Sequence, residues 1–112
     1  MSNLTKIKKN GDFRKIYNRH KSVADRNMVL YFLSNNKEAC RFGFTVSKKV
    51  GNAVKRNRVR RLFHEVCRLN KEKFPSGYDF ILLARREIVG LNFCQIEEGL
   101  LRLLKKLKIN RG

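Results

Sequence analysis

Acidic residues are scarce in this sequence. Nine Asp and Glu residues stand against 27 Lys and Arg residues, so the 112-residue chain carries a formal net charge of +18. Charge of one sign on so small a protein repels itself and attracts polyanions, because neutralising phosphates releases their counterions. The scarcity of acids therefore predicts a nucleic acid as the partner.

Long hydrophobic runs are also absent. The longest, residues 80–84, is far shorter than the roughly 20 residues of a membrane-spanning helix, and the N-terminus lacks the apolar core of a signal peptide. We therefore expect a cytoplasmic protein with no membrane partner. A membrane-active basic protein is a weaker alternative, because the longest amphipathic helix is needed for the core.

Residues that support catalysis or metal binding are few and scattered. Cys40, Cys67 and Cys94 are odd in number and widely spaced, which favours reduced thiols over disulfides or a zinc site. His20 and His64 have no second ligand at a metal-binding spacing. The sequence also lacks a carboxylate pair, a nucleophile elbow and a phosphate-binding P-loop. We predict no catalytic residues and no metal site in the protein itself.

Hydrophobic residues make up 42% of the chain, which is enough to drive burial of a core. The length predicts a single domain over residues 1–112, with a flexible basic N-terminus at 1–9. Periodicity predicts helices at 12–19, at 53–73 and after a capping box at Asn92 and Gln95, and strands at 27–34, 41–47 and 78–84. Residues 35–38 indicate a hairpin turn. This order predicts an α+β domain with helices covering one side of a mainly antiparallel sheet.

The aromatic residues allow two interpretations. Residues on the predicted apolar faces are expected in the core, and they are Phe42, Phe44, Phe63, Phe80 and Phe93. Phe13, Tyr17 and Tyr31 can instead line a groove and stack on unpaired bases. For Tyr17 and Tyr31 the sequence leaves both interpretations open. The strand at 41–47 alternates apolar with polar residues, so its polar face is predicted to be open to a ligand.

The strongest functional signal is the segment 48–68, which contains many cations and one acid, Glu65. Five cations fall within residues 55–61. On a helix, Val59, Leu62, Phe63 and Val66 share one face, and the opposite face gathers Asn57, Arg60, Arg61, His64 and Arg68. A solvated face would interleave acids with its cations. We therefore predict that this face binds RNA, because a guanidinium donates paired hydrogen bonds to phosphate.

The stretch 41–58, RFGFTVSKKVGNAVKRNR, closely resembles the signature of bacterial ribonuclease P protein components. The resemblance extends to an early helix containing Asp12 and Phe13, an aromatic strand around Tyr31, and the segment 78–85. It implies an α-β sandwich like domain 2 of ribosomal protein S5, in the order α-β-β-(β)-α-β-α, with a left-handed crossover.

The resemblance also implies a function. In this family the protein assists an RNA subunit that performs Mg²⁺-dependent endonucleolytic maturation of tRNA 5′ ends, and the Mg²⁺ is held mainly by the RNA. A monomeric protein, one per RNA, is expected to bind both the RNA subunit and precursor tRNA. The rival hypothesis is a ribosomal or general nucleic-acid chaperone protein.

Two sets of site residues follow from the helix and the resemblance together. The predicted contacts with the catalytic RNA are Lys48, Lys49, Asn52, Lys55, Arg56, Asn57, Arg58, Arg60, Arg61 and Arg68. The predicted cleft for the single-stranded 5′ leader consists of Phe13, Tyr17 and Tyr31. His64 departs from the family pattern, so no role is carried over to it.

Overall fold

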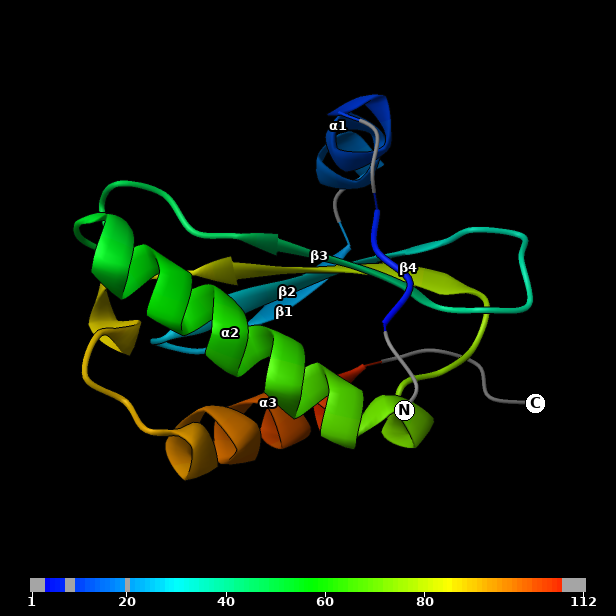
Figure 1. The fold of residues 1–112 in the computed structure, drawn as a ribbon. Helices are drawn as coiled ribbons and strands as arrows, with labels where there is room; N and C mark the ends of the chain where they lie inside the picture. Colours follow the sequence, from blue (N-terminus) through cyan, green and yellow to red (C-terminus); the bar gives the residue numbers. More distant parts are fainter. Residues whose placement is uncertain (1–3, 8–9, 20, 108–112) are drawn as a thin grey trace.

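The computed structural model describes residues 4–7, 10–19 and 21–107. The elements follow the predicted order, with the optional third strand present (Figure 1). They are α1 (Asn10–Arg19), β1 (Ser22–Ala24), β2 (Met28–Ser34), β3 (Arg41–Thr45), α2 (Ala53–Leu69), the short 3₁₀ helix η1 (Lys71–Lys73), β4 (Tyr78–Ala84), a second 3₁₀ helix η2 (Arg86–Ile88) and α3 (Phe93–Lys106). The α+β class is confirmed.

The sheet has the strand order β1-β2-β4-β3, so the predicted hairpin between β2 and β3 is wrong. β4 lies between them, antiparallel to β2 and parallel to β3. The reason is the composition of β4, which is apolar on both faces and is therefore most stable at the centre of the sheet. Residues 35–40 form a connection that passes the end of β4 instead of a tight turn.

The parallel pair β3 and β4 is joined through α2, and this crossover is left-handed, as expected (Figure 1). It places the loop before α2 and the start of η2 next to each other at the same end of the sheet, because parallel strands end at the same edge. Both segments carry cations, so the crossover concentrates positive charge at that end.

Helices lie on both faces of the sheet, which corrects the prediction that they cover one side (Figure 1). α2 and α3 cover one face and form the main core with the sheet. α1 covers the other face, where Ile16 packs with Ile7 and Ile81 in a second, smaller cluster. Ile81 is fully buried, and covering an aliphatic side chain of this size contributes about 1.5–3 kcal/mol. The second apolar face of β4 therefore explains why α1 docks there.

The ends of the two long helices differ in how well they follow the predictions. α2 ends at Leu69, short of the predicted Lys73. Asn70 caps this end, its side-chain amide donating to the carbonyl of Val66 beside its own backbone N–H, and the chain continues as the 3₁₀ helix η1. The predicted capping box of α3 is confirmed: Asn92 and Gln95 exchange hydrogen bonds of 2.9 and 3.0 Å. No helix in the described ranges has both the length and the apolarity needed to cross a membrane.

Residues 4–7 lie along the outer side of β3. Phe42 donates its backbone N–H to the carbonyl of Thr5 and accepts from the N–H of Ile7, at 2.8 and 2.9 Å. Leu4 and Ile7 are buried. This part of the segment predicted to be flexible therefore has defined contacts, while residues 1–3 and 8–9 lie outside the described residues.

Candidate nucleic-acid interface

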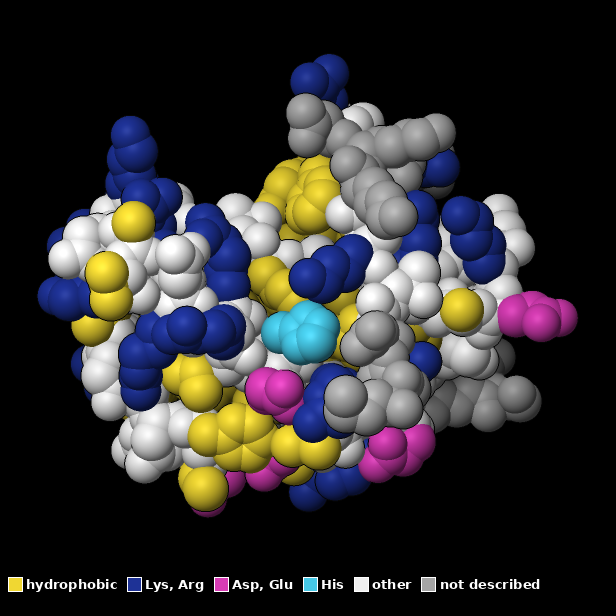
Figure 2. Space-filling view, in the orientation of Figure 1, with side chains coloured by type: hydrophobic (Ala, Val, Ile, Leu, Met, Phe, Trp, Pro, Cys, Tyr) yellow, Lys and Arg dark blue, Asp and Glu magenta, His cyan; other side chains and the backbone are white. Residues whose placement is uncertain are grey.

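The predicted basic surface begins where β3 ends and α2 starts. Asn52 caps α2 by accepting from the N–H of Lys55 at 3.0 Å, and the first turn contains no acid. The partial positive charge of the helix N-terminus therefore adds to the nearby cations. Lys48, Lys49 and Lys55 are exposed. Figure 2 shows Lys and Arg side chains gathered over this end of α2 and the loop before it.

Two arginines of α2 are fixed by backbone carbonyls. Arg58 donates to the carbonyl of Leu91 at 3.1 Å, and Arg60 donates to Val46 at 3.4 Å and to the side chain of Asn57 at 2.9 Å. A guanidinium has five N–H donors, so each keeps donors for a phosphate. These contacts hold the side chains in place without neutralising them, which reduces the entropy lost when a ligand binds.

Arg68 is the member of the predicted set with a carboxylate partner. It donates two hydrogen bonds to Glu65, at 2.8 and 3.0 Å, and these bonds hold the pKa of Glu65 below its usual value. None of the other cations predicted to contact the catalytic RNA forms an ion pair with a described residue. With respect to the described residues, the array on the first half of α2 is therefore uncompensated, and Arg68 lies at its margin.

The three predicted cleft aromatics lie on the α1 side of the sheet and are partly exposed. The rings of Tyr17 and Tyr31 meet edge to face, with centroids 4.9 Å apart. The Tyr17 hydroxyl hydrogen-bonds Thr45 at 2.8 Å, and burial raises the pKa of that hydroxyl, so the phenol stays neutral. Each tyrosine ring packs on the small cluster and still exposes part of its surface. Both interpretations of these residues, as core and as stacking groups, therefore hold in part.

Phe13 lies directly over Gly43 of β3. A Cβ atom at Gly43 would be 2.6 Å from two carbons of the Phe13 ring, so the ring occupies the space that any other residue would fill. The remaining phenylalanines follow the prediction: Phe42, Phe63 and Phe80 are fully buried, and Phe44 and Phe93 pack at the margin of the core. Sequence reasoning missed Gly43 as the residue that makes room for Phe13.

A groove of about 540 Å³ connects this aromatic region to the basic helix. Phe13 and Phe44 supply apolar walls, while Arg60, Arg61 and His64 line it from α2. His64 contacts Phe44 edge to face, with ring centroids 6.3 Å apart. The structure thus places a residue without an assigned role in the same groove as two predicted RNA contacts.

A second groove, of about 580 Å³, lies at the carboxyl ends of β3 and β4. It is lined by Thr45 and Lys49 on one side and by Arg85 and Arg86 on the other. The two arginines were not predicted as site residues. Their position directly after a buried strand that runs parallel to β3 is the signal that would have placed them beside Lys49.

The described residues contain no group of three or more His, Cys, Asp and Glu side chains able to hold a metal ion. The acids in the described part of the chain are not clustered, whereas a Mg²⁺ site needs several oxygen ligands close together. No chemical step is therefore assigned to a metal held by the protein. An array of cations next to partly exposed aromatic rings, on a small α+β scaffold, is the arrangement of an RNA-binding protein.

The comparisons with known proteins identify the family. The family model for ribonuclease P matches residues 1–108. The chain is 56% identical to the ribonuclease P protein component of Pelotomaculum thermopropionicum over the full length of both, and 46% identical to that of Alkaliphilus oremlandii over 97% of this chain and 96% of the relative.

Solved structures agree with the sequence comparisons. The ribonuclease P protein of Staphylococcus aureus superposes with a TM-score of 0.84 at 38% identity, covering 93% of this chain and 95% of the other. The ribonuclease P protein of Thermotoga maritima superposes with a TM-score of 0.85 at 30% identity, covering 93% of this chain and 98% of the other. The chain belongs to the ribonuclease P protein family, the protein subunits of a ribonucleoprotein endoribonuclease that matures the 5′ ends of tRNA.

Proposed function

We propose that this protein uses the two surfaces described above for two different RNAs. The basic face of α2 and the loop before it bind the RNA subunit of ribonuclease P. The aromatic region around Phe13, Tyr17 and Tyr31 receives the single-stranded 5′ leader of precursor tRNA. The observation that carries this proposal is the array of cations on α2 without carboxylate partners among the described residues.

The chemistry of each surface supports its assignment. Fixed guanidinium groups suit the phosphates of a folded RNA, whereas half-exposed aromatic rings suit unstacked bases, each worth about 1–3 kcal/mol of stacking. Arg85 and Arg86 line the groove near Thr45, where they can neutralise leader phosphates. The predicted site residues thus fall into two groups, cations for the RNA subunit and aromatic rings for the leader.

The Mg²⁺ ions that this family of enzymes needs are, in this proposal, held by the RNA subunit. Cations of the protein reduce phosphate repulsion where the two RNAs meet, which raises the occupancy of nearby Mg²⁺ sites. The protein acts as a monomer, one per RNA, because its high net charge opposes self-association. The complex is expected in the cytoplasm.

Reconstitution tests the proposal. Cleavage of precursor tRNA by a bacterial ribonuclease P RNA is measured at low Mg²⁺ with and without this protein, and we expect strong stimulation. Substrates with and without a leader are then compared, because the leader cleft predicts a preference for the precursor. No stimulation, or equal binding of precursor and mature tRNA to the holoenzyme, would favour a general nucleic-acid chaperone instead.

Single substitutions test the basic face. Arg58→Ala and Arg60→Ala should each lower the slope of log affinity for the RNA subunit against log salt by roughly 0.7–0.9 per lost phosphate contact. Lys106→Ala, at the exposed end of α3, removes the same charge away from this face and is the matched control. If Arg58→Ala and Arg60→Ala give the same slope as the Lys106→Ala control, the guanidinium groups of Arg58 and Arg60 do not contact phosphate.

A further inference from the structure

A third polar groove lies at the end of the sheet opposite to the start of α2. It has a volume of about 550 Å³ and is bounded by α1, by residues 5–6 and by the connection from β2 to β3. Among the described residues, four cations line it, Lys6, Lys15, Lys37 and Arg41, together with one acid, Asp79. Neither the basic face of α2 nor the three cleft aromatics contribute to it.

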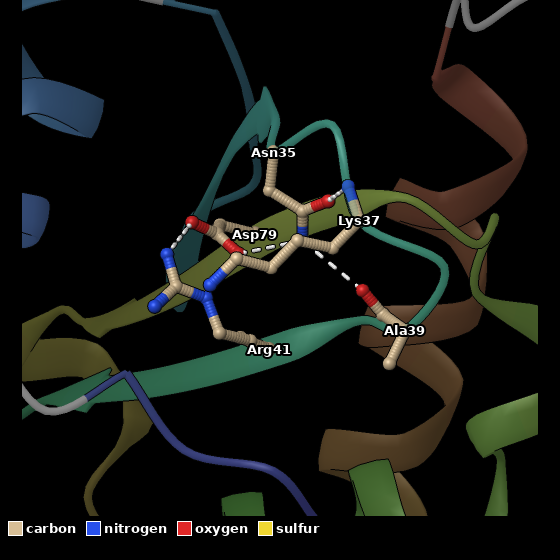
Figure 3. Close-up of polar contacts among 5 residues, drawn as sticks. All are labelled: Asn35, Lys37, Ala39, Arg41 and Asp79. Carbon is tan, nitrogen blue, oxygen red and sulfur yellow. Dashed lines mark hydrogen bonds and ion pairs between the residues drawn. The ribbon is translucent and has the colours of Figure 1, made fainter.

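The acid in this groove is already neutralised. Asp79 is 4% exposed and accepts two hydrogen bonds from the Arg41 guanidinium, and it accepts a third, of 2.9 Å, from the amide of Asn35 (Figure 3). The three lysines have no carboxylate within ion-pair distance in the described part of the chain, and their side chains are exposed. The described residues of the groove therefore present net positive charge to the solvent.

The connection that carries Lys37 has a defined shape. Asn35 donates to the carbonyl of Ala39 at 3.0 Å and accepts from the N–H of Lys37 at 2.8 Å, while its own N–H donates to Gly77. Asn36 takes a left-handed backbone conformation, which Asn tolerates better than most residues. Figure 3 shows the Lys37 side chain extending back in the direction of the Arg41 guanidinium. The Lys37 side chain therefore lies on the groove side of the connection.

The lining of the groove indicates the kind of anion. Its described lining contains no aromatic ring, and so these residues offer no platform for unstacked bases. Thr5, Ser34 and Asn36 add hydroxyl and amide groups suited to phosphate oxygens and 2′-hydroxyls. A polar, basic groove without stacking groups fits the backbone of base-paired RNA, which proteins recognise through phosphate and 2′-hydroxyl contacts.

We propose that the groove formed by Lys6, Lys15, Lys37 and Arg41 binds the sugar-phosphate backbone of a base-paired segment of the ribonuclease P RNA subunit. This inference rests on the proposed function, because it assumes that the RNA subunit is the partner. It adds a second contact with the RNA subunit, at the end of the sheet opposite to the basic face at the start of α2. The protein then touches the RNA subunit at both ends of its sheet.

The test uses the double variant Lys15→Ala/Lys37→Ala in the full-length protein. Affinity for the RNA subunit is measured over a range of salt concentrations. Loss of two phosphate contacts on a duplex should lower the slope of log affinity against log salt by roughly 1.8, at about 0.9 per contact. The charge-preserving variant Lys15→Arg/Lys37→Arg should keep the parent slope, and Lys105→Ala/Lys106→Ala at the end of α3 controls for net charge. Urea unfolding of each variant checks that the fold is intact.

The possible outcomes separate the two proposals. An unchanged slope for Lys15→Ala/Lys37→Ala, with reduced slopes for Arg58→Ala and Arg60→Ala, overturns the groove and leaves the proposed function standing. Unchanged slopes for all of these variants overturn both. If the assembled holoenzyme loses affinity only for precursor tRNA with a long leader, the groove is a leader site, which overturns its assignment to the RNA subunit.

Discussion

Replacing Gly43 by alanine tests the packing of α1 on the sheet. The added Cβ would lie 2.6 Å from two carbons of the Phe13 ring. Carbon atoms in contact prefer a separation of about 3.5–4.0 Å, so the ring must retreat by roughly 1 Å. Gly43 has no positive φ angle, and the effect of the substitution therefore comes from this contact rather than from backbone strain.

The size of the effect follows from how α1 is held. Phe13, Ile16 and Tyr17 attach this ten-residue helix to the sheet through the small cluster around Ile81. Overpacking at such a contact costs about 1–3 kcal/mol, and a displaced Phe13 also loses its place in the groove. Affinity for a precursor with a leader should then fall by up to the value of one stacked base, about 1–3 kcal/mol.

A double-mutant cycle with Phe13→Ala isolates the contact. Urea unfolding is measured at a fixed, moderate salt concentration, because the net charge of +18 makes stability depend on screening. In the Phe13→Ala background Gly43→Ala should cost almost nothing, which gives a coupling energy of about 1–3 kcal/mol. If Gly43→Ala costs the same in both backgrounds, the inferred contact between these two residues does not limit the packing of α1.

Three further predictions concern the scaffold. Arg41→Ala should lower the free energy of unfolding by about 3–5 kcal/mol in urea titrations, because it leaves the buried Asp79 carboxylate without its cation; a cost near that of a surface ion pair, about 0–1 kcal/mol, would contradict this. Asn92→Ala should cost about 1 kcal/mol through loss of the capping box, with the salt dependence of RNA binding unchanged. A thiol reagent should modify the exposed Cys94 first and reach the other two cysteines, whose pKa is raised by burial, only in denaturant; reaction of all three at equal rates in the folded protein would contradict the buried positions.

The elements could be predicted from the sequence because their signals are local. The capping box of α3 and the apolar face of α2 depend on residues within a few positions of one another. Pairing of strands depends on distant residues, and β4 separates β2 from β3 although it follows both in the chain. The continuous apolar run of β4 is typical of a central strand that is buried on both faces. Such a strand needs a helix on each side of the sheet to cover it.

The candidate site divides in the same way. The uncompensated charge of α2 is visible in the sequence, because a single acid at Glu65 can neutralise only its neighbour Arg68. The grooves cannot be predicted from the sequence, because the fold brings distant residues to the same groove. Arg86 and Lys49 line one groove, and Lys15 and Lys37 line another. Composition thus predicts the type of ligand, and tertiary structure decides where several short basic segments combine.

The pairing of residues 4–7 with β3 has a consequence for the protein before it meets RNA. A sheet whose outermost strand offers free N–H and C=O groups can add strands from other molecules and aggregate. Here the N-terminal segment occupies both backbone groups of Phe42, and the opposite border is formed by the three-residue β1. Self-repulsion, the short β1 and the partly occupied edge of β3 together disfavour the addition of strands from other molecules, and so favour a protein that stays dispersed until it binds RNA.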